Sequence, residues 1–365
     1  MFRLHHVVLV CISAGRLSAQ SVDVQLDSAR SVASITVGPL SVPAGTPYNH
    51  HFSQPPIQFT WPASGWVRGF RVELVDSAGR VLPREMLHHA GITNLDRRQL
   101  AYPTAERLVA AGRETAPVSL PGSFGTPLGA GQRMLLYYAL ANPTDRAVSG
   151  ATLRITMPWS AQDAHGIRTV MPIYFDAHPV LGAASTFDAV PGRAETSAEF
   201  TLPVGGHLRY LGGHLHDYGV ELRLEDAESH RVLARLEAER NRDGTIRGVE
   251  RTRFLLRWSG LRLDANRRYR VVAVYDNPSC EAARGAMGLL VAVFVPDDMR
   301  LWPAVDTTDA SYRRDLAWLM DTNGGDGGEA HRHEVGNETA VDSAVATAPS
   351  CSRSDPRQVE ASLRG

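Results

Sequence analysis

Short runs in which apolar and polar residues alternate fill most of the chain. In GFRVELV, Phe70, Val72 and Leu74 are apolar, the residues between them are charged, and a Ser-Ala-Gly turn follows. A period of two residues is typical of a β-strand with one buried face. The same pattern predicts strands at 135–141, 151–157, 168–175, 198–204, 220–224, 253–258, 269–275 and 287–295.

Helical periodicity is clear in one segment only, residues 309–320, where Tyr312, Leu316 and Leu319 share a face. This disfavours parallel βαβ units and predicts an all-β protein. The segment SAQDAHG interrupts the strand signals near 159–165, and a length of 365 residues suits two domains. We therefore expect β domains at 36–160 and 166–305. The composition from 323 to 365 predicts a disordered tail.

The composition limits the classes of partner molecule and of chemistry that we expect. The formal net charge is −1, so no overall field attracts nucleic acid, and we expect no nucleic-acid partner. After the first residues, no apolar stretch is long enough to cross a membrane, so no integral membrane segment is expected. Every basic residue other than histidine is Arg, which excludes a Schiff-base or phosphate-loop lysine.

Residues 1–19 have the pattern of a signal peptide. A basic Arg3 precedes a short apolar run, and Leu-Ser-Ala at 17–19 resembles a cleavage site. We therefore expect a secreted or periplasmic protein, with a lipoprotein anchored through Cys11 as the alternative. Cys280 and Cys351 would then remain, and they either pair in an oxidising compartment or stay unpaired.

The most informative residues are histidines. His214 and His216 lie in YLGGHLHDYGVELRLED. Residues two apart on a strand point to one face, so the two imidazoles can converge on one metal ion. If the strand continued unbroken through Leu222, both rings would face the apolar interior, where something must satisfy them. The alternative is a hydrogen-bonded histidine pair without metal.

Met287 lies in GAMGLLVAVFV, which is predicted to be a buried strand. Alone, such a methionine fills the core. A thioether beside two imidazoles would favour copper, especially Cu(I), over zinc.

The order of these motifs resembles a known family. FDAVPGRAETSAEF (187–200) precedes the His-Leu-His segment, YDNPSCEAARGAMG leads to Met287, and MLHHAG holds the adjacent pair His88 and His89. Across roughly residues 55–300 the chain is similar to the copper type II, ascorbate-dependent monooxygenases, the family of peptidylglycine and dopamine monooxygenases.

The resemblance implies two jelly-roll-like β-sandwich domains packed side by side, with a short C-terminal helix. It implies that His214, His216 and Met287 are catalytic and hold the copper where O2 binds. His88 and His89 would hold a second copper that relays electrons. Ascorbate or another external reductant would supply the electrons, and a small organic molecule would be the substrate.

The sequence departs from the family at several positions. Ala139 stands where the family has the third histidine of the N-terminal site. Gly212, Leu289 and Val291 stand where it has its peptide-binding Arg, Asn and Tyr. Adjacent histidines on a regular strand point to opposite faces, so His88 and His89 need a β-bulge to converge; otherwise one is packed and one exposed. The other candidate ligands are Met86, His50 and His51.

We therefore expect a secreted copper monooxygenase whose N-terminal site binds metal more weakly than its C-terminal site. Two alternatives remain from the sequence. One is a non-catalytic copper-binding or copper-handling protein, and the other is a β-sandwich binding module with a vestigial metal site. Oxygen uptake with ascorbate would separate an enzyme from a pure binder.

Overall fold

The computed structural model describes residues 21–47, 55–180, 185–254 and 260–320. The expected signal peptide, the tail at 323–365, His50, His51, Cys351 and most of the strand expected at 253–258 lie outside these described residues.

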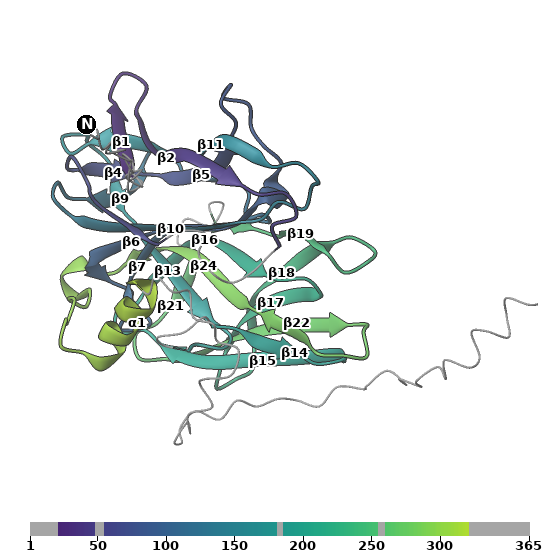
Figure 1. The fold of residues 1–365 in the computed structure, drawn as a ribbon. Helices are drawn as coiled ribbons and strands as arrows, with labels where there is room; N and C mark the ends of the chain where they lie inside the picture. The colour runs from purple at the N-terminus through teal and green to yellow at the C-terminus, as the bar shows by residue number, and fades with distance from the viewer. Residues whose placement is uncertain (1–20, 48–54, 181–184, 255–259, 321–365) are drawn as a thin grey trace, which may run out of the picture.

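The protein is all-β, with two jelly-roll-like sandwiches packed side by side and one α-helix in the described chain (Figure 1). This confirms the fold class expected from the alternating pattern. Figure 1 shows the sheets of the two sandwiches stacked in layers.

The first sandwich consists of an outer and an inner sheet. The outer sheet has the order β1-β2-β11-β4-β9-β12, with β5 and β8 at its side. Its strands are β1 (Val22–Asp27), β2 (Val32–Val42), β4 (Gly65–Val67), β5 (Gly69–Val75), β8 (Val118–Ser119), β9 (Phe124–Leu128), β11 (Val148–Ala161) and β12 (Arg168–Thr169). The inner sheet, in the order β3-β10-β6-β7, contains β3 (Ile57–Thr60), β10 (Arg133–Leu140), β6 (Leu87–Arg98) and β7 (Ala105–Gly112), and the 3-10 turn η1 (Arg84–Met86) precedes β6.

The second sandwich repeats this layering. Its inner sheet has the order β13-β24-β16-β20, with β21 beside β16. These strands are β13 (Met171–Asp176), β24 (Gly288–Pro296), β16 (Gly206–Leu215), β20 (Thr252–Arg253) and β21 (Leu261–Leu263). The outer sheet contains β15 (Gly192–Thr201), β22 (Arg268–Asn277), β17 (Gly219–Asp226), β18 (Val232–Arg240) and β19 (Ile246–Val249), and the ribbon of β14 (Phe187–Ala189) and β23 (Ala283–Ala286) adjoins it. After β24 come the 3-10 turn η3 (Met299–Leu301) and the helix α1 (Ala310–Met320).

Each sandwich has its own core between its two sheets. Ile92 and Leu136 of the inner sheet meet Ile35 and Leu153 of the outer sheet in the first core, and all four are at most 1% exposed. Leu215 of β16 is fully buried in the second core. Full burial of such a side chain contributes roughly 1.5–3 kcal/mol, so the apolar positions of the alternating pattern stabilise the layers.

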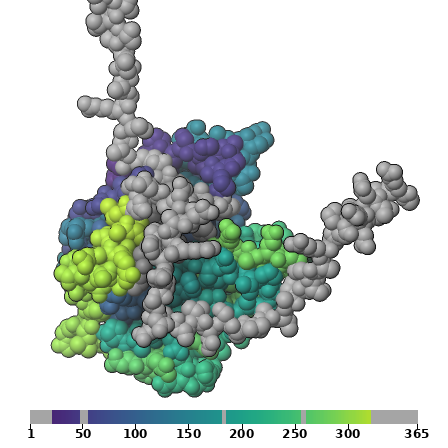
Figure 2. All heavy atoms as spheres, turned by 60° about the horizontal axis from the view of Figure 1, so that its bottom comes forward, coloured from purple at the N-terminus to yellow at the C-terminus, as the bar shows by residue number. Residues whose placement is uncertain are grey.

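The helix α1 returns to the first sandwich after the chain has completed the second. Tyr312 and Leu319 are buried against the inner sheet of the first sandwich, and the Tyr312 hydroxyl donates to the Leu95 carbonyl at 3.0 Å. An ion pair joins Arg107 of β7 to Asp315 of α1 at 2.5 Å. Figure 2 shows the yellow C-terminal part of the described chain lying against the blue residues of the first sandwich.

Two further expectations concern cysteine and the membrane. Cys280 is disulfide-bonded, and its partner lies outside the described residues. Among the described residues, α1 and every other helix are too short or too polar to cross a membrane.

Candidate metal centre

A β-bulge at the start of β6 brings His88 and His89 together. Ala139 of β10 pairs with His89, and the next residue, Leu140, pairs with Leu87, so His88 is skipped in the register. The extra residue turns both side chains toward the same side, and the imidazole rings stack with centroids 4.1 Å apart. The expected need for a bulge is confirmed. Both histidines are partly buried, so the alternative of one packed and one exposed ring does not hold.

His214 and His216 lie at the end of β16 and face the first sandwich. Strand β16 ends at Leu215, and the chain turns through Tyr218, whose φ of 70° is in the left-handed region. Leu215 points into the second core, so the two histidines, one residue away on either side, point to the opposite face. The strand does not continue unbroken into β17, so the condition under which both rings would face the interior of their own sandwich is not met.

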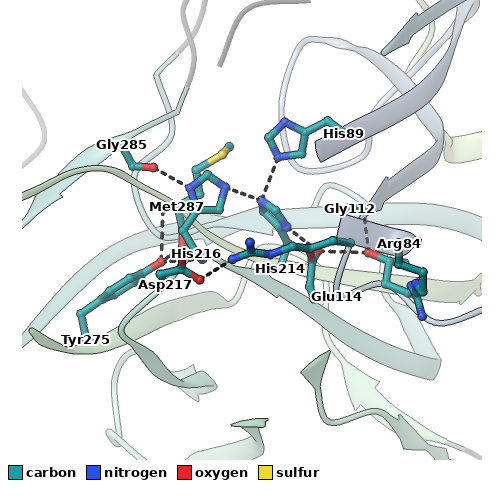
Figure 3. Close-up of polar contacts among 12 residues, drawn as sticks. Arg84, His89, Gly112, Glu114, His214, His216, Asp217, Tyr275, Gly285 and Met287 are labelled. Carbon is teal, nitrogen blue, oxygen red and sulfur yellow. Dashed lines mark hydrogen bonds and ion pairs between the residues drawn. The ribbon is translucent and has the colours of Figure 1, made fainter. Parts of the chain in front are cut away.

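The two histidine pairs meet in one cluster. Nε2 of His214 lies 3.0 Å from Nε2 of His216 and 3.4 Å from Nε2 of His89. Ligand atoms of His88, His89 and His216 all lie within 4.8 Å of one another. Figure 3 shows the ring of His89 entering from one side of the cluster and the rings of His214 and His216 from the other. The sequence suggested two separate sites, but the structure places these four imidazoles in one.

Hydrogen bonds on the far side of two rings fix their tautomers. Nδ1 of His214 lies 2.6 Å from a carboxylate oxygen of Glu114, and Nδ1 of His216 lies 2.7 Å from the carbonyl oxygen of Gly285. Both oxygens accept, so both Nδ1 atoms donate, and in the neutral rings the Nε2 atoms carry lone pairs. Two lone pairs that face each other at 3.0 Å repel unless a metal ion or a shared proton lies between them.

Glu114 reaches His214 because the neighbouring residue is small. A Cβ atom added at Gly112 would lie 2.5 Å from a Glu114 carboxylate oxygen, so a side chain there would displace the carboxylate. Burial acts to raise the pKa of Glu114, but its interactions with His214 outweigh burial and hold that pKa below its ordinary value. A carboxylate that orients a histidine in this way is typical of the surroundings of a metal ligand.

Tyr275 connects the two segments of the second sandwich that reach the cluster. Its hydroxyl accepts from the backbone N–H of His216 at 3.0 Å and of Met287 at 3.2 Å, and it donates to the Met287 carbonyl. Tyr275 is 1% exposed, and burial raises its pKa well above the ordinary value. The tyrosine therefore fixes the backbone of His216 relative to that of Met287.

Met287 lies just before β24, between two strands rather than inside a buried one. In the antiparallel register of β16 and β24, His214 pairs with Leu289 and Leu215 pairs with Gly288, so the next position sets His216 opposite Met287. Figure 3 shows the Met287 side chain on the same side of the sheet as the His216 ring. The expectation that the Met287 segment lies beside the His-Leu-His strand is confirmed, and the role of the sulfur as a ligand stays a prediction.

Cavities adjoin the cluster on two sides. One cavity of about 260 Å³ lies between the sandwiches and is lined by His89, His214 and Met287 at one end. The other, of about 300 Å³, is lined by His88, His214 and His216 together with charged residues. An ion pair between Arg113 of the first sandwich and Asp217 of the second borders this second cavity. Small molecules can therefore approach the cluster from an apolar side and from a polar side.

The nitrogen spacing suits a transition-metal ion. With metal–nitrogen bonds of about 2.0–2.1 Å, neighbouring nitrogens lie about 3.3–3.4 Å apart in a tetrahedron and about 2.8–3.0 Å apart in a square plane. The observed separations of 3.0 and 3.4 Å fall in these ranges. Imidazoles that also donate Nδ1–H to oxygen acceptors are the donor set that copper and zinc prefer.

Sequence reasoning missed Glu114 and Tyr275. Glu114 precedes His214 by 100 residues and belongs to the other sandwich, so no local spacing pointed to it. Tyr275 begins the YDNPSCEAARGAMG segment, and its position in a predicted strand before Met287 was the available signal.

Comparisons with known proteins add little to this geometry. No protein-family model and no curated protein matches the chain. Among solved structures, the chain is similar to one from Sulfolobus turreted icosahedral virus (TM-score 0.33, 12% identity, 79% of this chain and 97% of that one). It is also similar to the major capsid protein P2 of bacteriophage PM2 (TM-score 0.34, 11% identity, 71% and 99%) and to PNGF-II (TM-score 0.26, 11% identity, 75% and 62%). Likenesses this weak carry no functional argument.

Proposed function

We propose that the protein binds one copper ion per chain at the junction of its sandwiches, through His89, His214 and His216 with His88 and Met287 beside them. We further propose that it is a monooxygenase that hydroxylates a small organic substrate with O2 and an external reductant such as ascorbate. Secretion or a periplasmic location fits this proposal, because Cys280 is disulfide-bonded.

The observation that carries the proposal is the meeting of Nε2 atoms from both sandwiches. Glu114 holds His214 and the Gly285 carbonyl holds His216, so these two rings have a defined orientation toward the cluster. The thioether of Met287 at the edge of the cluster favours Cu(I) over zinc.

The residues of the chain have separable roles in this scheme. Bound copper would supply the activation of O2 for hydroxylation. Glu114 holds His214 in one orientation, and Tyr275 sets the distance between the His216 and Met287 segments. The apolar cavity beside His89 and His214 excludes water and holds a substrate next to the cluster.

One observation favours a second candidate, a protein that binds or carries copper without catalysis. Four imidazoles and a thioether in one place can fill all coordination positions, whereas a catalytic site keeps a position open. Oxygen consumption by the copper-loaded protein with ascorbate and a bound small molecule separates the two, since a pure binder gives the copper signal without turnover.

The metal proposal is tested by counting copper in His89→Ala and His214→Ala, with the exposed His165 as a matched control in His165→Ala. We expect one copper per chain in the wild type and in the control. Each cluster variant should lose at least tenfold in Cu(I) affinity, because both histidines belong to one site.

Two results would overturn this scheme. Two copper ions per wild-type chain, with one retained at full affinity in His89→Ala, would show separate sites in the two sandwiches. No copper retention by a wild type that folds normally would exclude copper as the natural metal.

A further inference from the structure

The cavity between the sandwiches is long and leads away from the histidine cluster. Along β7 it follows the chain from Arg107 to Gly112, which is about 17 Å for five residues of an extended strand. His89, His214 and Met287 line one end, and Asp315 and Trp318 of α1 line the other. Its volume of about 260 Å³ is near the lower limit of small-molecule sites, about 300–1,000 Å³.

The walls are apolar and come from both sandwiches. On β24, Leu289, Val291 and Val293 alternate with core residues and are half-buried because they face the cavity. The facing wall includes aliphatic residues of β7. The rings of Tyr102 and Tyr174 also line the cavity, and their centroids lie 5.2 Å apart. A ligand therefore meets mostly hydrocarbon and ring surfaces.

The charged groups away from the histidine end, and the Tyr102 hydroxyl, are already bonded within the protein. Arg107 pairs with Asp315 and also donates to the Ala105 carbonyl. The carboxylate of Asp176 accepts from the backbone N–H of His178 at 2.8 Å. The Tyr102 hydroxyl accepts from the backbone N–H of Asp176 at 2.9 Å.

Away from the histidine end, no cation among the lining residues remains to pair with a carboxylate or phosphate, because Arg107 is the one Arg or Lys of the cavity and is bonded to Asp315. A buried charge that lacks a partner costs several kcal/mol. The apolar length of the cavity between the histidine cluster and α1 thus disfavours anions. A cationic ligand would have to compete for carboxylates that already have partners.

We propose that this cavity binds an uncharged, largely apolar small molecule of about the size of one substituted ring. That this molecule is the substrate of the metal centre rests on the function proposed above, whereas its binding does not. The reacting end of the ligand would lie toward His89 and His214, and its far end toward Trp318.

Calorimetry of the metal-free full chain with three probes of matched size tests the proposal. The probes are 2-phenylethanol, phenylacetate and 2-phenylethylamine. We expect 2-phenylethanol to bind at least tenfold more tightly than either charged probe. Equal or tighter binding of phenylacetate, or of 2-phenylethylamine, would overturn the uncharged class, and so would a failure of all three to bind.

A pair of variants on β24 locates the binding. Val291→Phe fills the cavity and should weaken 2-phenylethanol at least tenfold. Val295→Phe, on the same strand but not in the lining, should leave binding unchanged. Thermal unfolding confirms that both variants fold. Unaltered binding by a folded Val291→Phe variant would overturn the location.

The outcomes also separate the two proposals. Selective 2-phenylethanol binding by a protein that holds no copper would leave the cavity proposal intact and refute the copper site. Copper binding without any selectivity among the probes would leave the copper site intact and refute the cavity proposal.

Discussion

Replacing Glu114 with Gln should weaken Cu(I) binding by ten- to a hundredfold. The carboxylate lies 2.6 Å from Nδ1 of His214, and its side chain is 3% exposed. Gln keeps an oxygen that can accept this hydrogen bond but removes the negative charge that strengthens it. Hydrogen bonds to charged groups contribute about 1.5–3 kcal/mol, and a factor of ten in affinity corresponds to about 1.4 kcal/mol. Loss of a partner that orients a metal-binding histidine typically costs ten- to a hundredfold in metal affinity.

The assay is an anaerobic competition titration against a coloured Cu(I) chelator at fixed pH. Glu228→Gln is the matched control, because Glu228 is exposed and remote from the cluster. Wild-type Cu(I) affinity in a folded Glu114→Gln variant would refute the reasoning, since it would mean that the negative charge of Glu114 does not strengthen metal binding by His214.

Three further predictions follow from buried polar groups. Burial raises the pKa of Asp176 to about 6, so the folded protein holds this proton more tightly than the unfolded chain and loses stability as the pH rises from about 4 to above 6. We therefore compare the unfolding free energies of Asp176→Asn and the wild type, both metal-free, in urea. The difference should shift in favour of the variant by up to about 3 kcal/mol from pH 4 to pH 8, and a pH-independent difference would contradict this. Tyr275→Phe leaves buried N–H groups of His216 and Met287 without an acceptor and should lower the unfolding free energy by about 1–3 kcal/mol, with weaker Cu(I) binding in the same titration; unchanged values would contradict the role of the hydroxyl. Asp315→Asn leaves the buried guanidinium of Arg107 without its counter-charge and should cost about 3–5 kcal/mol in urea unfolding, and a loss below 1 kcal/mol would argue against a buried pair.

The all-β fold class and the local geometry of His88 and His89 could be predicted from the sequence, for identifiable reasons. The period of two along strands such as β5 depends on local burial alone, and it predicted the all-β class. The requirement for a bulge at His88 followed from strand geometry, and the register of β6 and β10 confirms it.

The meeting of the two histidine pairs in one cluster could not be predicted from the sequence. It depends on how two sheets pack across the interface, over 125 residues of sequence from His89 to His214. The direction of the His214 and His216 rings depended on where β16 ends, and Tyr218, with its positive φ, carries no clear sequence signal for that turn. Glu114 enters only through the same interface.

The position of α1 has a consequence for how the molecule unfolds. The chain leaves the first sandwich at Val170, builds the second, and comes back so that Tyr312 and Asp315 are buried against the first. The second sandwich is thus tethered at both of its ends, and separation of the two would first have to detach the helix and expose Arg107. The two sandwiches should accordingly melt as one cooperative unit, with a single calorimetric transition where two independent domains would give two.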